Sequence, residues 1–498
     1  MTFNASDLGW LSPYLIMAVA GMLLVLAEAF YKGRDRTALA GLAVAGSLAS
    51  AIASIILYRQ LGAGETHALF TDVDANGAVR SVMLIADKDG YVLSTLFAIL
   101  TALTALSSPA HQREHDWQMG EYYGVMLLSA SGMIMLAHAA NLVTIFLGIE
   151  TMSIGVYVMV AMRRRSRRGN EAAMKYFLIG AFATGFLMYG IALLYGAAGT
   201  TSLLHMQAAI ANTANPGLVV AGAFLLVVAF GFKIAAVPFH MWAPDAYEGA
   251  PTPVTGFMAA AVKAAAIAAM LRVFGLALGG DTVPYGTLGW ASPMVVIAAI
   301  TITVGNITAI RQDNIKRMLA YSSISHAGVL LVGISAMGLG SPTAHTAVIY
   351  YLIAYSFTTM GAFTIVSYVG SRGRERLLVD DWAGLASEHP AAALAMTICL
   401  LSFGGIPPTG GFFGKFYVFK AAMEVYNGQL LWLVIIGVIN SAISIYCYLR
   451  IVTAMYFREA PHPFAVTRSP GLVFVIALMP LLVLEMGIMP GWWLHLVG

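Results

Sequence analysis

The chain has 498 residues, of which 59% are hydrophobic and only 10% are charged, and its net charge is +3. This composition excludes a water-soluble globular protein and indicates a membrane protein. The two cysteines form no CxxC motif, so iron–sulfur, c-type haem and zinc sites are unsupported, and no nucleotide-binding Walker motif is present.

Apolar runs of about 20 residues, the length that crosses a bilayer as a helix, recur along the whole chain. They predict an all-α polytopic membrane protein with about 14 transmembrane helices. The predicted spans are 11–31, 38–60, 91–107, 123–138, 140–161, 174–196, 218–245, 254–276, 291–309, 318–336, 345–369, 391–424, 431–456 and 472–495. The first span is expected to remain in the protein, because the opening MTFNASDLGW lacks the features of a signal peptide.

Residues 62–90 are the one sizeable polar insertion, between the second and third predicted spans. Hydrophobic and polar residues alternate there around Asn76-Gly77, which is a strong signal for a β-hairpin. We predict an antiparallel hairpin on the outer surface, and a flexible loop is the alternative.

Basic residues are concentrated in alternate loops between the predicted spans. The richer set is Lys32, Arg34, Arg36, Arg113, Arg163, Arg164, Arg165, Arg167, Arg168, Arg311, Lys316, Arg317, Arg372, Arg374, Arg376, Arg458 and Arg468. The other loops hold little beyond Arg80 and Lys88. The positive-inside rule therefore places the richer set in the cytoplasm and both termini outside. A nucleic-acid patch is the alternative for the run RRRSRRG, and its position beside a span disfavours that alternative.

Four lysines and a glutamate lie within or at the ends of apolar spans: Lys175, Lys233, Lys263, Lys415 and Glu150. A charge at membrane depth costs several kcal/mol or more, usually faces the protein interior, and by default marks an ion or proton path. Lys233, Lys263 and Glu150 are predicted near the midplane and Lys415 in the outer half. Lys175 begins the sixth span, where snorkelling to the inner face is an adequate alternative.

Proline interrupts two of the predicted spans. Pro238 breaks the seventh span near Lys233, and Pro407 and Pro408 break the twelfth span before Lys415. Irregular backbone at membrane depth is tolerated only beside protein or a water-filled cavity. The alternative is a pair of proline kinks without function.

The two interrupted spans are five helices apart and run in opposite directions. This arrangement predicts two inverted five-helix repeats, formed by helices 4–8 and 9–13. The predicted parts of this single membrane domain, residues 1–498, are the N-terminal helices with the hairpin (1–122), the first repeat (123–276), the second repeat (291–456) and the C-terminal helix (472–498).

The charged residues within the spans predict a proton relay. A lysine in a dry interior loses its proton readily, and a nearby carboxylate restores it. We predict that Glu150 pairs with Lys233 and that Lys263 lies next along the membrane, with water bridging between them. The alternatives are a static ion pair that holds the helix register and, for His326 near the inner end of the tenth span, a packing role. Arg272, near the outer end of the eighth span, is expected to snorkel.

Five segments carry a family resemblance: LGIETMSIGVYVMVA, EAAMKYFLIGAFATGFLMYGIALLYG, FKIAAVPFHMWAPDAYEGAPTPVTGFMAAAVKAAA, IKRMLAYSSISHAGVLL and FGGIPPTGGFFGKFYVFKAA. With them, essentially the whole chain resembles the antiporter-like subunits of respiratory complex I, and most closely the bacterial N subunits, called subunit 2 in mitochondria. The lysine after GFFG, Lys415, is typical of N subunits, whereas M subunits carry glutamate there. The stretch APDAYEGAPTPVT is shared with the wider family, which includes Mrp-type sodium/proton antiporters.

The resemblance implies a role for each site residue. Glu150 and Lys233 match the glutamate–lysine pair of the first half-channel, and Lys263 matches the central bridging lysine. Lys415 matches the second-half lysine linked to the outer side. Lys175 and His326 match supporting positions.

The resemblance also implies a proton-translocating subunit of NADH:quinone oxidoreductase in the bacterial cytoplasmic (inner) membrane, without a cofactor or metal of its own. NAD, FMN, iron–sulfur clusters and quinone are then expected in partner subunits, and the implied partners are antiporter-like and small membrane subunits and lipids, with no nucleic acid. A subunit of an Mrp-type sodium/proton antiporter is the alternative function, and a membrane scaffold without an ion path is a third.

Overall fold

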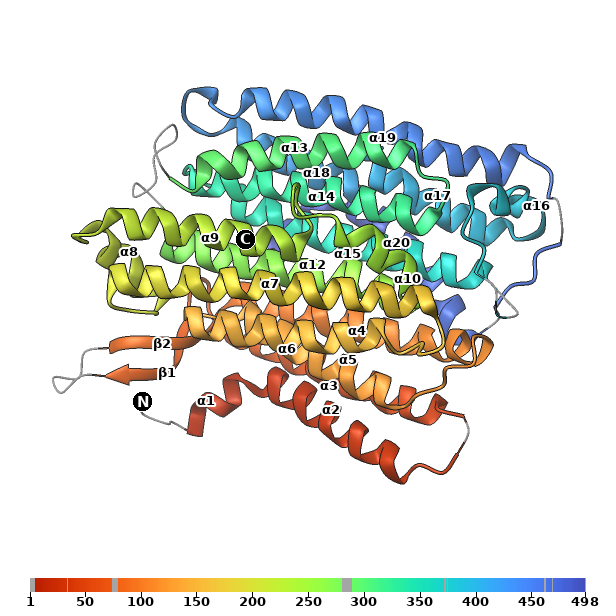
Figure 1. Cartoon of the computed structure of the whole chain (residues 1–498), viewed down its shortest axis with the longest axis horizontal. Coiled ribbons are helices and arrows are strands. Elements are labelled where there is room, and N and C mark those ends of the chain that lie inside the picture. The colour runs from red at the N-terminus through yellow and green to blue at the C-terminus, as the bar shows by residue number, and fades with distance from the viewer. Residues whose placement is uncertain are drawn as a thin grey trace.

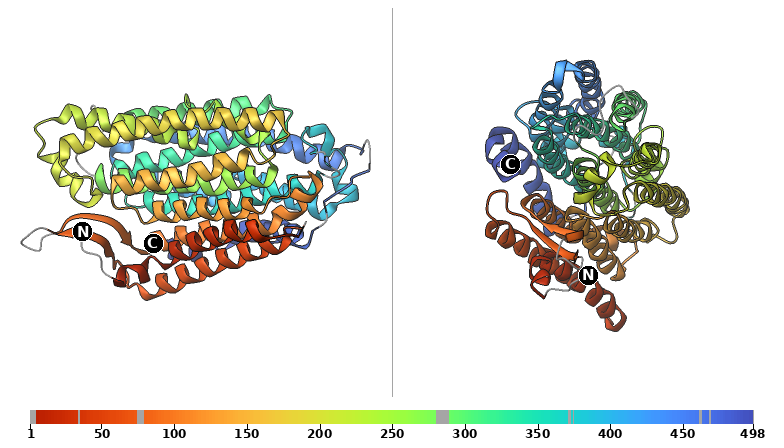
Figure 2. Two further views of the ribbon diagram at one scale, coloured as in Figure 1. Left: turned by 60° about the horizontal axis from the view of Figure 1, so that its bottom comes forward. Right: turned by 90° about the vertical axis from the view of Figure 1, so that its left-hand side faces the viewer.

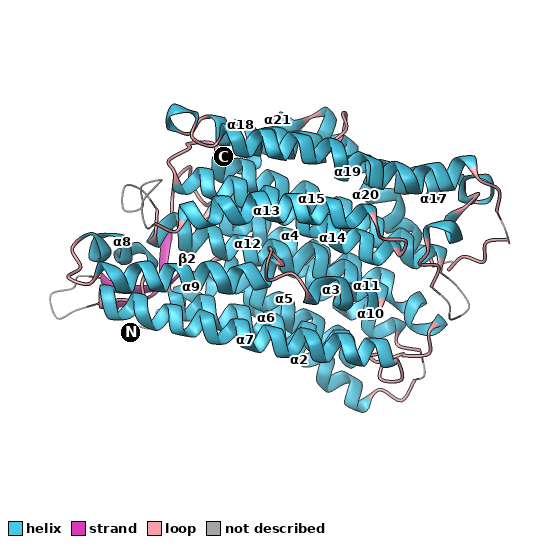
Figure 3. Ribbon diagram, turned by 45° about the horizontal axis from the view of Figure 1, so that its top comes forward, coloured by secondary structure: helices cyan, strands magenta, loops and turns pink. Residues whose placement is uncertain are grey.

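The computed structural model describes residues 5–33, 35–73, 79–279, 289–370, 373, 375–460, 463–467 and 469–497. Within these residues the chain forms a bundle of helices that run nearly parallel to one another (Figure 1). Two strands lie at one end of the bundle, and the remaining regular structure is helical (Figure 3). The observed fold is therefore the all-α bundle that the sequence predicts.

The elements follow one another along the chain with short connections. The N-terminal part contains α1 (Ala5–Trp10), α2 (Ser12–Phe30), α3 (Thr37–Gln60), β1 (His67–Val73), β2 (Val79–Ala86) and α4 (Lys88–Glu114). The middle part contains α5 (Glu121–Ala137), α6 (Leu142–Val160), α7 (Arg167–Ala198), α8 (Leu203–Ala211), α9 (Pro216–Ile234), α10 (Trp242–Gly249), α11 (Thr252–Phe257), the π-helix η1 (Met258–Val262), α12 (Lys263–Arg272) and the π-helix η2 (Val273–Ala277).

The C-terminal part repeats the pattern of long and short helices. It contains α13 (Ala291–Ile310), α14 (Ile315–Gly338), α15 (Ala344–Val369), the 3₁₀-helix η4 (Val379–Trp382), α16 (Leu385–Glu388), α17 (Pro390–Gly404), α18 (Gly410–Met423), the 3₁₀-helix η5 (Tyr426–Gly428), α19 (Leu431–Phe457), α20 (Pro470–Ile488) and α21 (Pro490–Val497).

Among the described residues, 12 helices are long and apolar enough to cross a membrane. The shorter apolar helices α5 and α17 occupy the places of the fourth predicted span and of the first half of the twelfth. The continuous helix Thr252–Ala277 is buried on all sides, and α14 and α15 are nearly so. Helices α2 and α7 bury only a minor part of their surface and form the rim of the bundle. In the view along the bundle, α2 and α7 lie at the edge and the buried helices α14 and α15 lie nearer the middle (Figure 2).

The predicted hairpin is confirmed. Strands β1 and β2 pair antiparallel, with His67 opposite Ala86 and Leu69 opposite Leu84. The Ile85 amide of β2 donates a hydrogen bond of 2.8 Å to the carbonyl of His138, which anchors the hairpin on the end of α5. The turn residues Asn76 and Gly77 lie outside the described residues.

Both predicted breaks are present. Helix α9 ends at Ile234, the next residue Ala235 is in the left-handed region at φ 59°, and α10 begins only at Trp242. Helix α17 ends at Gly404 in the same way, with the left-handed Gly405 at φ 75°, and α18 begins at Gly410. Proline cannot donate the backbone hydrogen bond that a continuous helix needs. The pairing of these breaks as two inverted repeats stays a prediction.

Contacts join the basic loops at one end of the bundle. Arg113 at the end of α4 lies 3.4 Å from Asp35 in the loop after α2, and Arg458 lies 2.6 Å from Asp380. Lys316 at the start of α14 lies 3.4 Å from Glu375 in the loop after α15. These loops therefore share one face, as the alternation of charge predicts, while the side of the membrane that they face stays a prediction. Arg34, Arg372, Arg374, Arg468 and the terminal Gly498 lie outside the described residues.

The expectation that Arg272 snorkels is wrong. The side chain is buried, and its guanidinium group donates to both carboxylate oxygens of Asp87 at 2.5 and 2.6 Å. It also donates to the carbonyl of Ala137 at 2.6 Å. Because Asp87 lies at the start of α4, distant in sequence from Arg272, the apolar pattern around Arg272 carries no signal of this partner.

Candidate functional site

Lys233 lies in the last turn of α9, directly before the first break, and its side chain is buried. Its ammonium group donates hydrogen bonds to the hydroxyls of Ser153, at 2.9 Å, and Tyr157, at 3.3 Å. Both acceptors belong to α6 and are one turn apart, so they form a single polar face toward α9.

Glu150 does not form the predicted direct pair with Lys233. Its carboxylate accepts a hydrogen bond of 2.6 Å from Thr184 on α7, and no ion pair joins it to Lys233 in the described part of the chain. Glu150 precedes Ser153 by three residues, which places both near one face of α6. Ser153 and Tyr157 therefore occupy the positions next to Lys233, while the carboxylate turns toward α7.

Lys263 is the first residue of α12, directly after the π-helix η1, and it is buried near the centre of the bundle. Its ammonium group donates to both the backbone carbonyl and the hydroxyl of Ser323 on α14. The Ser323 hydroxyl also bonds to Tyr355 of α15 at 2.8 Å and to Tyr247 of α10 at 3.3 Å. Ser323 therefore connects the central lysine to three other helices.

His326 belongs to a second hydroxyl network on the same helix, α14. One ring nitrogen lies 2.5 Å from the hydroxyl of Tyr351, and the other lies 3.4 Å from that of Tyr448. Tyr448 in turn bonds to Ser322 at 2.6 Å. Ser322 and Ser323 are neighbours in the chain, so the networks of His326 and Lys263 start from adjacent residues of α14, although no hydrogen bond joins them within the described residues.

Lys415 lies on α18, after the second break, and its side chain is also buried. Its ammonium group donates to the carbonyls of Phe403 at 2.8 Å and Gly404 at 3.3 Å, at the end of α17. The last carbonyls of a helix have no partner within the helix and carry partial negative charge. The break therefore supplies the neutral acceptors that hold Lys415.

A small cavity lies between Lys233 and Lys263. Both lysines line it, together with Tyr176, Trp242 and Tyr247, and its volume of about 10 Å³ is on the order of the space that one water molecule occupies. The two lysines thus line one site large enough for about one water molecule.

Lys175 stands apart from these buried lysines. It is nearly half exposed and lies 2.7 Å from Glu171 and 2.8 Å from Asp245. Asp245 also pairs with Arg317 at 2.8 Å. Lys175 therefore belongs to an ion-pair network at the end of the bundle where the basic loops meet.

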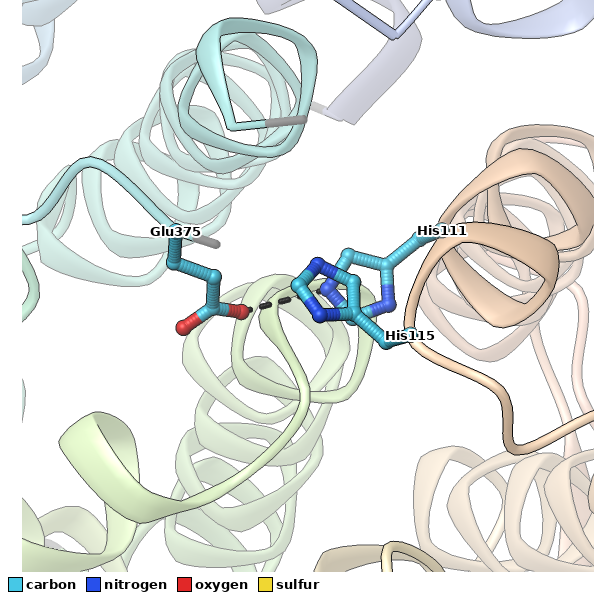
Figure 4. A group of neighbouring side chains, drawn as sticks. All are labelled: His111, His115 and Glu375. Atoms are coloured by element: carbon cyan, nitrogen blue, oxygen red, sulfur yellow. Dashed lines mark hydrogen bonds and ion pairs between the residues drawn. The ribbon is translucent and has the colours of Figure 1, made fainter. Parts of the chain in front are cut away.

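One group of side chains among the described residues has the composition of a metal site: His111, His115 and Glu375 (Figure 4). Glu375 accepts hydrogen bonds from His111 at 3.1 Å and Thr252 at 2.6 Å, and the fully buried Lys316 lies 3.4 Å from its other oxygen.

The charge of this group favours a structural ion pair. Burial raises the pKa of Glu375, but Lys316 and His111 outweigh it and hold that pKa well below its usual range. Burial lowers the pKa of His115 to about 4, so this ring is neutral at pH 7. The ion pair of Lys316 and Glu375 is already balanced. A divalent cation would leave buried positive charge without a partner, which is costly.

The structure adds residues that the sequence analysis missed. They are the hydroxyl-bearing residues of the hydrogen-bond networks around Glu150, the buried lysines and His326: Ser153, Tyr157, Thr184, Tyr247, Ser322, Ser323, Tyr351, Tyr355 and Tyr448. The spacing of Ser153 and Tyr157 from Glu150 was a usable signal, since positions three and seven residues on share a helix face. The other partners come from separate helices, and only packing brings them to the lysines.

The fold, which buries Lys233, Lys263 and Lys415, is that of an antiporter-like membrane subunit, and the comparisons agree. The family model described as "NADH:quinone oxidoreductase/Mrp antiporter, TM" matches residues 139–444, more than half of the chain. The chain is 41% identical over 480 residues to the NADH-quinone oxidoreductase subunit N of Trichlorobacter lovleyi, covering 95% of this chain and 93% of that protein. It is 42% identical over 488 residues to subunit N 1 of Sorangium cellulosum, covering 96% and 95% of the two chains.

Solved structures share the fold. A chain of respiratory complex I from Thermus thermophilus is 30% identical with a TM-score of 0.79, covering 98% of this chain and 100% of that one. A chain of the Mrp complex from Dietzia is 20% identical with a TM-score of 0.85, covering 99% and 96%, which shows a common fold alone. The chain belongs to the NADH:quinone oxidoreductase/Mrp antiporter family and, within it, to the NADH-quinone oxidoreductase subunit N proteins.

Proposed function

We propose that this chain is the proton-translocating, non-redox N subunit of a bacterial NADH:quinone oxidoreductase. The observation that carries the proposal is the burial of three lysines, Lys233, Lys263 and Lys415, of which the first two line one water-sized cavity. In the proposed complex, NAD, FMN, iron–sulfur clusters and quinone bind to partner subunits. The partners of this chain are antiporter-like and small membrane subunits and lipids.

The partners of the lysines suit them to carrying protons. Lys233 and Lys263 bond to hydroxyl and carbonyl oxygens, and Lys415 bonds to carbonyls alone. A carboxylate fixed beside each lysine would hold the charged form, whereas neutral acceptors leave both protonation states accessible. Glu150 lies about one helix turn from the Ser153 hydroxyl, near enough to influence Lys233 without holding its proton.

The proposed relay passes in order through Lys233, Lys263, the network of His326, and Lys415. A proton leaves Lys233, which becomes neutral, and crosses the water-sized cavity to Lys263. From Lys263 the proposed path passes through the hydroxyl of Ser323 and then crosses to the separate network of Ser322, Tyr448 and His326 on the same helix. Lys415 completes the path at the second break.

Two further parts of the proposal concern placement. We place the chain in the cytoplasmic membrane with the basic loops inside, which puts both termini outside. A reporter enzyme fused after the last residue should be active only on the outer side. Activity confined to the cytoplasm would overturn this orientation.

The test of the relay uses the assembled complex with Lys233→Ala, Lys263→Ala or Lys233→Arg. Arginine keeps the charge but does not readily release its proton, so it tests proton transfer itself. NADH oxidation by an artificial acceptor should survive in each variant, while quinone-coupled pumping falls.

Lys420→Ala is the matched control. Lys420 also lies on α18, but it is half exposed, and its one ion pair among the described residues is with Glu424 at 3.8 Å. Normal pumping in assembled Lys233→Ala and Lys263→Ala complexes would return these lysines to a structural role. Pumping that requires sodium would favour the antiporter function instead.

A further inference from the structure

A second cavity, which neither Lys233 nor Lys263 lines, lies where the end of α4, the end of α6 and the start of α7 meet. Its volume is about 550 Å³. Arg163, Arg164 and Arg165 line one part of it, and Met119 and Met162 line another. The cavity therefore combines a strongly basic side with an apolar side.

The three arginines have no acidic partner among the described residues, in contrast to their neighbours in the chain. Arg168 lies 3.5 Å from Glu248, whereas none of Arg163, Arg164 and Arg165 forms an ion pair within the described ranges. Asp116 is the one carboxylate that lines the cavity, so the positive charge there is in excess. The lining ring of His115 adds no charge, because burial lowers its pKa to about 4.

The helix α7 adds to the positive potential. Ser166, which also lines the cavity, caps the start of this 32-residue helix by accepting a hydrogen bond of 3.1 Å from the Gly169 amide. The first turn of a helix carries partial positive charge and attracts anions, phosphate above all. Guanidinium groups bind phosphate with paired hydrogen bonds. Three arginines and the start of a helix thus line one cavity.

We propose that this cavity binds a phosphate-bearing anion. The apolar wall of Met119 and Met162 fits the glycerol and upper acyl region of an acidic phospholipid, while a soluble phosphate would use the basic side alone. Basic pockets at the ends of membrane helices are suited to anionic lipid headgroups. The positive-inside rule explains why several arginines follow α6, but it does not require that three of them line one cavity.

The test measures binding to the purified full chain in detergent by native mass spectrometry. One arm titrates phosphatidylglycerol, and a second arm adds millimolar inorganic phosphate as ligand and as competitor. The site variant is Arg164→Gln with Arg165→Gln. The control is Arg167→Gln, whose exposed side chain begins α7 two residues further on and does not line the cavity. A third variant, Arg164→Lys with Arg165→Lys, keeps the positive charge that sets the topology. It removes the planar guanidinium groups, which can form paired hydrogen bonds with phosphate.

The site variant is expected to weaken phosphatidylglycerol binding by about tenfold or more, and the lysine variant by less, with the control unchanged. Direct binding of inorganic phosphate, lost in the same variant, would assign the site to soluble phosphate. Equal binding of both ligands by the site variant and the control would overturn the proposal.

Discussion

Replacing Glu375 by glutamine should destabilise the protein strongly, because it leaves the charge of Lys316 buried. Lys316 is fully buried, and without Glu375 its remaining partner among the described residues is the carbonyl of Ala250 at 2.7 Å. Removing one member of a buried ion pair costs about 3–5 kcal/mol. The Glu375 side chain is 14% exposed, so we expect the lower value, about 3 kcal/mol, which is roughly two orders of magnitude in the unfolding equilibrium.

The assay is unfolding of the purified chain in detergent micelles by a graded denaturant. The informative comparison is the double variant Lys316→Met with Glu375→Gln, which removes both charges and should recover most of the loss. A single variant as stable as the unmodified chain would refute the reasoning. So would a double variant less stable than Glu375→Gln alone, because both results would mean that Lys316 does not depend on this carboxylate.

The same pair predicts a pH dependence. The pKa of Glu375 is lower in the folded chain than in the unfolded chain, where it is about 4.3. The unfolded state therefore takes up the proton first as the pH falls. The stabilisation by Glu375 should be complete above about pH 5 and should decline as the pH falls through the folded pKa. In Glu375→Gln this part of the acid sensitivity should disappear.

Two further comparisons of variants test the lysine site and the second break. Ser153→Ala should lower quinone-coupled pumping more than Tyr157→Phe, because Lys233 bonds to Ser153 at 2.9 Å and to Tyr157 at 3.3 Å; the reverse order in pumping assays on assembled complexes would contradict this assignment. Gly411→Ala should destabilise the chain by about 1–3 kcal/mol, because the added methyl group meets the carbonyl of Ser402. Its control is Gly185→Ala, where nothing lies within 4 Å and where unfolding in micelles should detect no loss.

The amino-acid sequence by itself determined the class of the fold and the identity of the lysines. Apolar runs long enough to cross a bilayer can form only helices there, since backbone polar groups in lipid must bond within the chain. Proline at positions 238, 407 and 408 favours the breaks for a similarly local reason, the missing backbone donor, although α4 and α20 continue through Pro109 and Pro480. The cost of charge at membrane depth pointed to Lys233, Lys263 and Lys415, and all three side chains are buried.

Tertiary structure alone decided what each of these charges contacts. Sequence reasoning paired Glu150 with Lys233 by opposite charge, but in the folded bundle the Lys233 side chain bonds to Ser153 and Tyr157 of α6 instead. It missed Asp87 as the partner of Arg272, because the two residues lie on helices far apart in the chain. Periodicity along one helix shows which face is polar. Which neighbouring helix that face meets, and at what position along the helix axis, depends on the packing of the whole bundle. A hydrogen bond requires this position to be matched within about 1 Å.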